Sequence, residues 1–340
     1  MSFFQRQQCL FRQFCWYCWL CYACLCLSSV ASAQTNDTLQ QKSTRIPFLQ
    51  KAEQVHRGRA CLISVGSGVA YGSTMTAIGK IWYSQYEQSR FHFFNDNSGW
   101  LQIDKVGHAW TAYNQAYLGA NLYEWAGYSP QKAAWIGFGI ANVFQGGIEV
   151  LDGFSVGWGA SWGDIGSNFL GASLHLSQAL LWQEQRILFK YSTHQPKYGS
   201  YPLQVQARAE ALYGGNFAQK WLKDYNAQSY WLSVNPSAFM GKNKVFPAWL
   251  NLAVGYSAED MFGAESNTWK NPNNPDMTYD FSAIQRYRQY YLSFDVDFSR
   301  IKMRSRWVKT ILKGINFIKF PAPALEWNTK SGFRFHPIYW

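Results

Sequence analysis

The segment QIDKVGHAWTAY, residues 102–113, places three ionisable side chains near the start of an apolar, aromatic-rich stretch. In an α-helix, Asp104 and His108 are four residues apart and Lys105 precedes His108 by three, so all three side chains project from one face. A carboxylate and an imidazole on one face can bind a divalent cation or exchange protons with a ligand. We therefore expect this face to meet water, protein or a ligand.

Two later stretches also carry polar side chains at helical spacing. One ends in Gln145, Glu149 and Asp152, and the next begins with Asp164 and Asn168 and continues to His175 at helical spacing. Antiparallel neighbouring helices would bring these groups and those of residues 104–108 to one end of a bundle. Such a cluster can be structural, with Lys105 neutralising the carboxylates, or it can bind a ligand or catalyse a reaction.

Ligand binding, catalysis and metal binding each have their own set of candidate residues. The candidate ligand-binding residues are Asp104, Lys105, His108, Glu149, Asp152, Ser161, Asp164 and Asn168. The catalytic candidates are His108, Asp104 and Asp164, and the metal-ligand candidates are His108, Glu149, Asp152 and Asp164. The paired histidines of zinc hydrolases, a nucleophile elbow and a phosphate-binding lysine loop are absent from the sequence. No cofactor or metal is assigned on these residues alone.

The N-terminus is typical of a secretory signal peptide. Arg6 and Arg12 precede an apolar core, and the small-residue sequence ASA ends at Ala33. A retained anchor helix is the alternative. Six of the seven cysteines lie in this segment, so a cleaved chain keeps only Cys61 and forms no internal disulfide. Residues 34–60 form a polar lead-in.

Composition and charge point to the cell envelope. Aromatic residues make up 18% of the chain, and tryptophan and tyrosine gather at membrane interfaces. The net charge of +11 becomes +9 without Arg6 and Arg12. Residues 184–340 hold twenty basic and eleven acidic side chains, whereas residues 34–183 hold nine of each. In an exported chain this excess favours anionic lipid or a cell-wall polymer over nucleic acid as the partner.

The hydrophobic pattern divides the chain into a helical part and a strand-rich part. We predict helices at about 62–83, 104–126, 130–150 and 163–183, in a module that either spans a membrane or forms a water-soluble bundle. Strands are predicted at 187–192, 229–235, 249–257 and 290–298, with a terminal hairpin at 325–340. Residues 267–278 read as a turn-rich loop. A basic amphipathic helix is predicted at 301–319, lying either in a lipid interface or against the sheet.

The motif DKVGH followed by EVLDGFSVGWGASWGDIGSNFLG resembles the YfiM-like family of predicted periplasmic lipoproteins, domain of unknown function 2279, in its long Bacteroidota-type form. The resemblance covers roughly residues 60–185. The motif order also resembles VanZ-like membrane proteins more distantly. This chain lacks the arginine that those proteins usually carry between the second and third elements of the motif. The family pattern falls on the eight candidate ligand-binding residues above and on Gly153, Ser155, Trp158 and Gly171.

The sequence therefore predicts an α+β protein. A signal peptide (1–33) and the lead-in (34–60) precede a four-helix module (61–185), which either spans a membrane or stands beside it, and an antiparallel β-rich region (186–340). We expect an exported envelope protein, at the outer membrane or its periplasmic face rather than the inner membrane, whose polar pocket binds a lipid headgroup or cell-wall precursor. The alternatives are a metal-assisted hydrolase of an envelope phosphoester or amide, and a structural partner in an outer-membrane complex.

Overall fold

The computed structural model describes residues 46–80, 87–240, 246–272 and 274–340. The expected signal peptide and residues 34–45 of the polar lead-in lie outside the described residues. The chain separates into two compact units. The helical unit comprises Met1–Asn95 and Thr111–Gln183, and the sheet unit comprises Asp96–Trp110 and Glu184–Trp340. The division therefore falls within a helix, between Trp110 and Thr111.

Four long helices lie where the hydrophobic pattern predicts them. They are α2 (Arg57–Ile78), α3 (Ile103–Trp125), α4 (Pro130–Gly153) and α5 (Trp162–Leu181). Their starts follow local capping rules: Ser129 caps α4 just before Pro130, and the Ser161 hydroxyl accepts a hydrogen bond from the backbone N–H of Asp164 at the start of α5. These predicted helices are confirmed to within a few residues at most ends.

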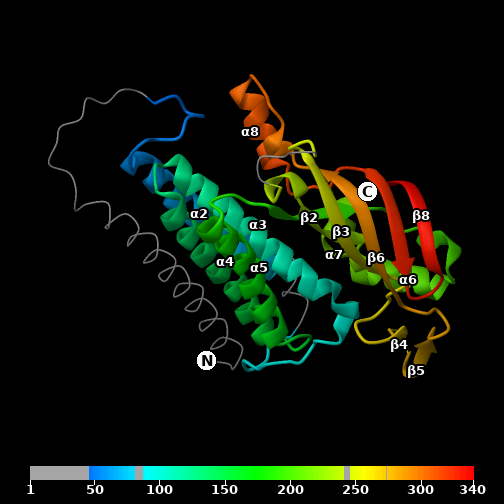
Figure 1. Cartoon of the computed structure of the whole chain (residues 1–340). Coiled ribbons are helices and arrows are strands. Elements are labelled where there is room, and N and C mark those ends of the chain that lie inside the picture. The colour runs from blue at the N-terminus through cyan, green and yellow to red at the C-terminus, as the bar shows by residue number, and fades with distance from the viewer. Residues whose placement is uncertain (1–45, 81–86, 241–245, 273) are drawn as a thin grey trace, which may run out of the picture. The chain divides into compact units, whose positions relative to one another are not determined.

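Small residues let the helices of the helical unit approach one another closely (Figure 1). Alanines at positions 112, 116, 141 and 172 join α3, α4 and α5 in one buried cluster. Gly137 lies against α3, where an added Cβ would sit 2.3 Å from the carbonyl oxygen of Ala116. Such close backbone contact between helices depends on small side chains.

The outer surface of the helical unit is strongly apolar. Helices α2 and α4 are long and apolar enough to cross a membrane, and only 22% and 39% of their most apolar windows are buried. Large exposed side chains on the unit include Leu62, Val65, Val69, Trp135, Phe169 and Leu170.

The sheet unit is built on a six-stranded antiparallel sheet of order β1-β2-β3-β6-β7-β8, whose strands run across Figure 1 from green to red. The strands are β1 (Ile187–Thr193), β2 (Gln228–Val234), β3 (Leu250–Glu259), β6 (Tyr287–Val296), β7 (Ala322–Asn328) and β8 (Gly332–Tyr339). Helices α6 (Leu203–Tyr213) and α7 (Phe217–Lys223) connect β1 to β2. The α+β class and the predicted strands are confirmed.

Two segments differ from the expectation. The stretch predicted as a turn-rich loop forms a small hairpin, in which β4 (Thr268–Asn271) pairs with β5 (Asn274–Asp280). The basic amphipathic helix is shorter than predicted, because α8 covers only Arg306–Gly314. Ser305 caps its start, and the residues after it extend so that Ile318 bridges to Tyr191 of β1. Pairing with the edge strand replaces the last predicted turns of the helix.

The sheet has its polar face buried and its apolar face exposed. On β6, Ser293 and Asp295 are buried, whereas Leu292 and Phe294 are exposed. The Ser229 hydroxyl of β2 lies 3.1 Å from the Tyr339 hydroxyl of β8, although three strands separate β2 from β8. Four strand spacings would cover about 19 Å in a flat sheet. The sheet therefore curls strongly around its polar face.

Candidate functional site

Helix α3 begins after a left-handed turn. Trp100, Leu101 and Gln102 have φ values of 51°, 50° and 64°, a conformation that costs about 1–2 kcal/mol per non-glycine residue. The Leu101 carbonyl oxygen accepts hydrogen bonds from the Tyr256 hydroxyl and, at 2.8 Å, from Arg288 Nη1. These contacts hold the turn and thereby fix where Asp104 begins the polar face of α3.

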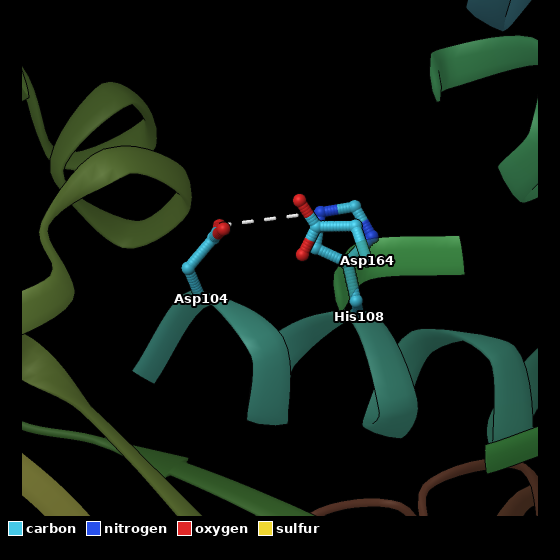
Figure 2. A group of neighbouring side chains, drawn as sticks. All are labelled: Asp104, His108 and Asp164. Carbon is cyan, nitrogen blue, oxygen red and sulfur yellow. Dashed lines mark ion pairs between the residues drawn. The ribbon is translucent and has the colours of Figure 1, made fainter. Parts of the chain in front are cut away.

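The three ionisable residues of α3 form an ordered group within the sheet unit. Figure 2 shows Asp104 and His108 one turn apart on α3, with His108 Nε2 4.0 Å from Asp104 Oδ1. The Tyr225 hydroxyl donates to Asp104 Oδ1 at 2.6 Å. Lys105 Nζ lies 2.7 Å from Asp96 Oδ2 and 3.3 Å from Asp104 Oδ2. The lysine therefore forms ion pairs with two carboxylates.

The next residues of α3 pack on the aromatic core of the sheet unit. An added Cβ at Gly107 would lie 2.8 Å from the Tyr230 hydroxyl oxygen, so glycine permits this approach. Trp110 contacts the rings of Tyr191, Tyr230 and Phe317. Burial raises the pKa of Tyr230 well above its usual value and raises the pKa of Tyr191 to about 12. Both phenols are therefore neutral packing groups near neutral pH.

A second group of polar residues lies inside the helical unit, on α4 and α5. Glu149, Ser161, Asp164 and Asn168 are all buried. The Ser161 backbone N–H donates to Glu149 Oε2 at 3.1 Å, and the Asp164 backbone N–H donates to Ser161 Oγ at 3.2 Å. Ser161 thus joins the end of α4 to the first turn of α5, and it positions both acidic residues.

The polar row continues along the helical unit. His175, two turns after Asn168 on α5, is buried and packs edge-on against the rings of Tyr113 and Tyr117. Gln145, one turn before Glu149, donates to Gln115 Oε1 at 3.0 Å. Buried carboxylates accept hydrogen bonds from hydroxyl or ammonium groups, and together with imidazole they are common ligands of divalent cations.

The structure thus divides the eight candidate residues between its two units. Asp104, Lys105 and His108 form one group in the sheet unit, whereas Glu149, Asp152, Ser161, Asp164 and Asn168 belong to the helical unit. Contacts within each unit join Asp104 to Lys105 and Glu149 to Ser161. The expectation that the two groups face one another stays a prediction, as does any role for His108 as a base.

Sequence patterns do not identify several of the residues that contact these groups. Tyr225 and Asp96 hold the start of α3, but nothing in their local sequence connects them to it. The sheet unit also contains a buried ion pair between Lys190 and Asp295. A lysine within the apolar strand ILFKYS was the available signal for that pair.

Comparison with known proteins bears on the segment that contains both groups. The family model described as "Predicted periplasmic lipoprotein (DUF2279)" matches residues 92–179 of the chain. The resemblance inferred from the DKVGH and WGDIGSNFLG motifs is confirmed over this range, which holds all eight candidate residues. The description supports export and association with the envelope. Neither the curated proteins nor the solved structures include a match to the chain.

Proposed function

We propose that the protein is a membrane-associated envelope protein that binds a lipid headgroup or a cell-wall precursor through its polar helical residues. The observation that carries the proposal is the buried row on α4 and α5. Glu149 and Asp164 are carboxylates in the interior of a helical unit whose outer surface is apolar. Burying carboxyl groups is costly whether they are charged or neutral, so a chain that keeps two of them in one interior usually does so for a purpose.

The chemistry of the row indicates the kind of ligand. Carboxylates and the Asn168 side-chain oxygen accept hydrogen bonds, and His175 can accept or donate one. A ligand bound there presents donors, such as the ammonium group of an aminoalcohol headgroup or the hydroxyl and amide groups of an amino sugar. Both kinds of group occur on envelope lipids and on cell-wall precursors. Asp104, Lys105 and His108, in the sheet unit, are a second candidate group for such a ligand.

The apolar exterior supports a membrane location. Exposed Leu62, Val65 and Val69 lie on α2, which passes the length and hydropathy requirements for a membrane span. In water, an apolar surface of this extent is unfavourable unless it is covered. We propose the outer membrane, or its periplasmic face, as the location. Extraction with alkaline carbonate and then detergent tests whether the helical unit is embedded in lipid, and release of the full chain by carbonate alone would contradict that. Separation of outer and inner membranes by density tests which membrane carries it.

A metal-assisted hydrolase of an envelope phosphoester or amide is the second candidate. The specific observation in its favour is the placement of Asp104 and His108 one turn apart on α3, with an oxygen and a nitrogen 4.0 Å apart. A carboxylate and an imidazole at this spacing can share one divalent cation, and metal-bound water is a nucleophile near neutral pH. The third candidate is a structural partner in a membrane complex.

Two substitutions separate these functions. His108→Ala and Asp164→Asn are purified beside the wild-type chain, and thermal stability and metal content are measured for each. Intact folding with no metal in any sample supports headgroup binding. Intact folding with loss of a stoichiometric metal supports the hydrolase and contradicts the leading proposal. Loss of folding in both variants without metal means that the polar groups are structural, which also contradicts it.

A further inference from the structure

The exposed face of the curled sheet carries a continuous apolar row. Leu232, Val254, Leu292, Leu325 and Phe335 are direct cross-strand neighbours on five adjacent strands, β2, β3, β6, β7 and β8. Each of these side chains is between 42% and 65% exposed. The row follows the curve of the sheet over four strand spacings. A second row, from Tyr290 through Trp327 to Phe333, lies beside it on the same face.

The opposite face of the sheet holds the polar residues. The inward neighbours of this row include Ser233, Ser293 and His336, and the inner face also contains the fully buried ion pair of Lys190 and Asp295. His336 Nε2 lies 2.5 Å from buried Glu326 Oε2. A sheet in water normally buries its apolar face and exposes its polar one. Here the alternation is reversed, as in sheets whose outer face meets hydrocarbon.

Helix α8, at the end of this sheet where β6 passes into β7, is amphipathic and unpacked. Trp307, Val308 and Ile311 are exposed, and none of the residues of α8 is buried. Of the apolar stripe within α8, only Leu312 is half-buried, and the rest stays exposed. The helix therefore presents an apolar stripe and a basic stripe to the surroundings.

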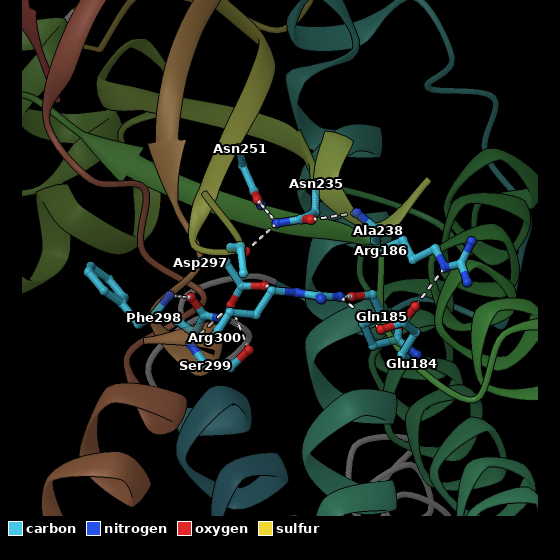
Figure 3. A network of polar contacts seen from close by, with 12 residues as sticks. Glu184, Gln185, Arg186, Asn235, Ala238, Asn251, Asp297, Phe298, Ser299 and Arg300 are labelled. Carbon is cyan, nitrogen blue, oxygen red and sulfur yellow. Dashed lines mark hydrogen bonds and ion pairs between the residues drawn. The ribbon is translucent and has the colours of Figure 1, made fainter. Parts of the chain in front are cut away.

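A basic cavity lies at the start of α8. It has a volume of about 480 Å³, and its lining includes Arg300, Lys302, Arg304 and Lys309. Arg300 is held in place by Asp297 and Glu184, as Figure 3 shows, with Nε 3.1 Å from Asp297 Oδ2 and Nη2 3.2 Å from Glu184 Oε2. No acidic residue occurs between Asp297 and Glu326 in the sequence. Lys302, Arg304 and Lys309 are exposed, and their own segment of the chain contains no acidic residue that could pair with them.

We propose that the sheet unit docks on an anionic lipid surface. The apolar rows and the stripe of α8 contact acyl chains, and the basic cavity binds the phosphate of a lipid headgroup. This surface is distinct from the polar residues of α3, α4 and α5, and the inference stands whether or not those residues bind a ligand. Cationic side chains beside an exposed apolar stripe complement a membrane interface, in which phosphates lie next to hydrocarbon.

A fluorophore attached to the apolar face tests the first half of the proposal. In the full chain with its native cysteines replaced by serine, Leu292→Cys is labelled with an environment-sensitive dye and the protein is reconstituted in phosphatidylcholine with 30% phosphatidylglycerol. Lipids brominated on their acyl chains are expected to quench this label. The matched label at Ala283→Cys, in an exposed loop, stays unquenched. An unquenched label at position 292 would contradict the proposal, because the face would then meet water or protein instead of acyl chains.

A charge series tests the second half. The label is moved to Trp307→Cys, and quenching is compared in phosphatidylcholine with and without phosphatidylglycerol. The variant Lys302→Gln/Arg304→Gln/Lys309→Gln is expected to shift the label toward water in the anionic membrane, by about fivefold in the partition equilibrium for each cation removed at low salt. The control Lys197→Gln/Lys220→Gln/Lys270→Gln removes three exposed cations elsewhere and leaves quenching unchanged. Equal shifts in both triple variants, or quenching indifferent to phosphatidylglycerol, would overturn the headgroup assignment.

Discussion

Replacing Lys190 with methionine is expected to destabilise the sheet unit severely. Lys190 and Asp295 are both 0% exposed, with Nζ 2.8 Å from Oδ2, and Nζ also donates to the Val296 carbonyl oxygen at 2.7 Å. Burial lowers the pKa of Lys190, and the nearby Asp295 opposes that shift. Without the lysine, the Asp295 carboxylate keeps bonds from Ser233 Oγ and the Phe320 N–H but loses the cation of its ion pair, and Lys319 acts on it only through longer-range attraction. Breaking such a pair costs about 3–5 kcal/mol.

Hydrogen exchange followed by mass spectrometry measures this loss locally, so the helical unit does not mask it. A loss of about 3–5 kcal/mol accelerates the exchange of protected amides in β1 and β6 on the order of 100-fold to 5,000-fold. The double variant Lys190→Met/Asp295→Leu removes both charges and is expected to recover much of the stability. The reasoning is refuted if the single variant changes exchange less than fivefold, or if the double variant is no more stable than the single one.

Two further predictions concern pH and helix packing. Burial lowers the pKa of Lys319 to about 8; between that value and the unfolded value near 10.5 the unfolded chain binds the extra proton, so the stability that Lys319 contributes rises with pH, by about 2 kcal/mol from pH 7 to pH 10. Lys190 and the buried tyrosines also have shifted pKa values, so the wild type is compared with Lys319→Met, in which their contributions are retained. Hydrogen exchange at the two pH values, corrected for intrinsic rates, should show a change in stability that is about 2 kcal/mol less favourable in Lys319→Met than in the wild type. Gly137→Ala is expected to destabilise the helical unit by about 1–3 kcal/mol in thermal unfolding, because its Cβ would meet α3. Gly139→Ala meets no atom within 4 Å and should be neutral or stabilising; equal losses in both would contradict the packing argument.

The sequence predicted the helices and most strands because local chemistry specifies them. Ser129 with Pro130 marks the start of α4, and the alternation through β6 marks a strand. The motif around Asp104 and Asp164 also identified the family match over residues 92–179. These signals lie within a few residues of the feature that they predict.

Other features depend on contacts between distant segments. Alternation along β6 shows that the two faces differ, but not which one is buried, and the reversed polarity emerges only from the curl that brings Tyr339 to Ser229. Asparagine and proline dominate the sequence of the hairpin of β4 and β5, and they predict a loop although the two strands pair. The grouping of residues 96–110 with the sheet depends on Tyr225 and Tyr230, more than a hundred residues away.

The proposed function requires that the buried acidic residues of α4 and α5 bind a ligand. Native mass spectrometry of the full chain, extracted from membranes in mild detergent, measures the fraction that carries a co-purifying headgroup lipid or cell-wall precursor. Glu149→Gln and Asp164→Asn are compared with Glu53→Gln, which removes an exposed acid from the same unit. We predict a bound species of one mass in the wild type and in Glu53→Gln, reduced at least tenfold in the other two variants at unchanged melting temperature. Equal occupancy in all four proteins would contradict the account.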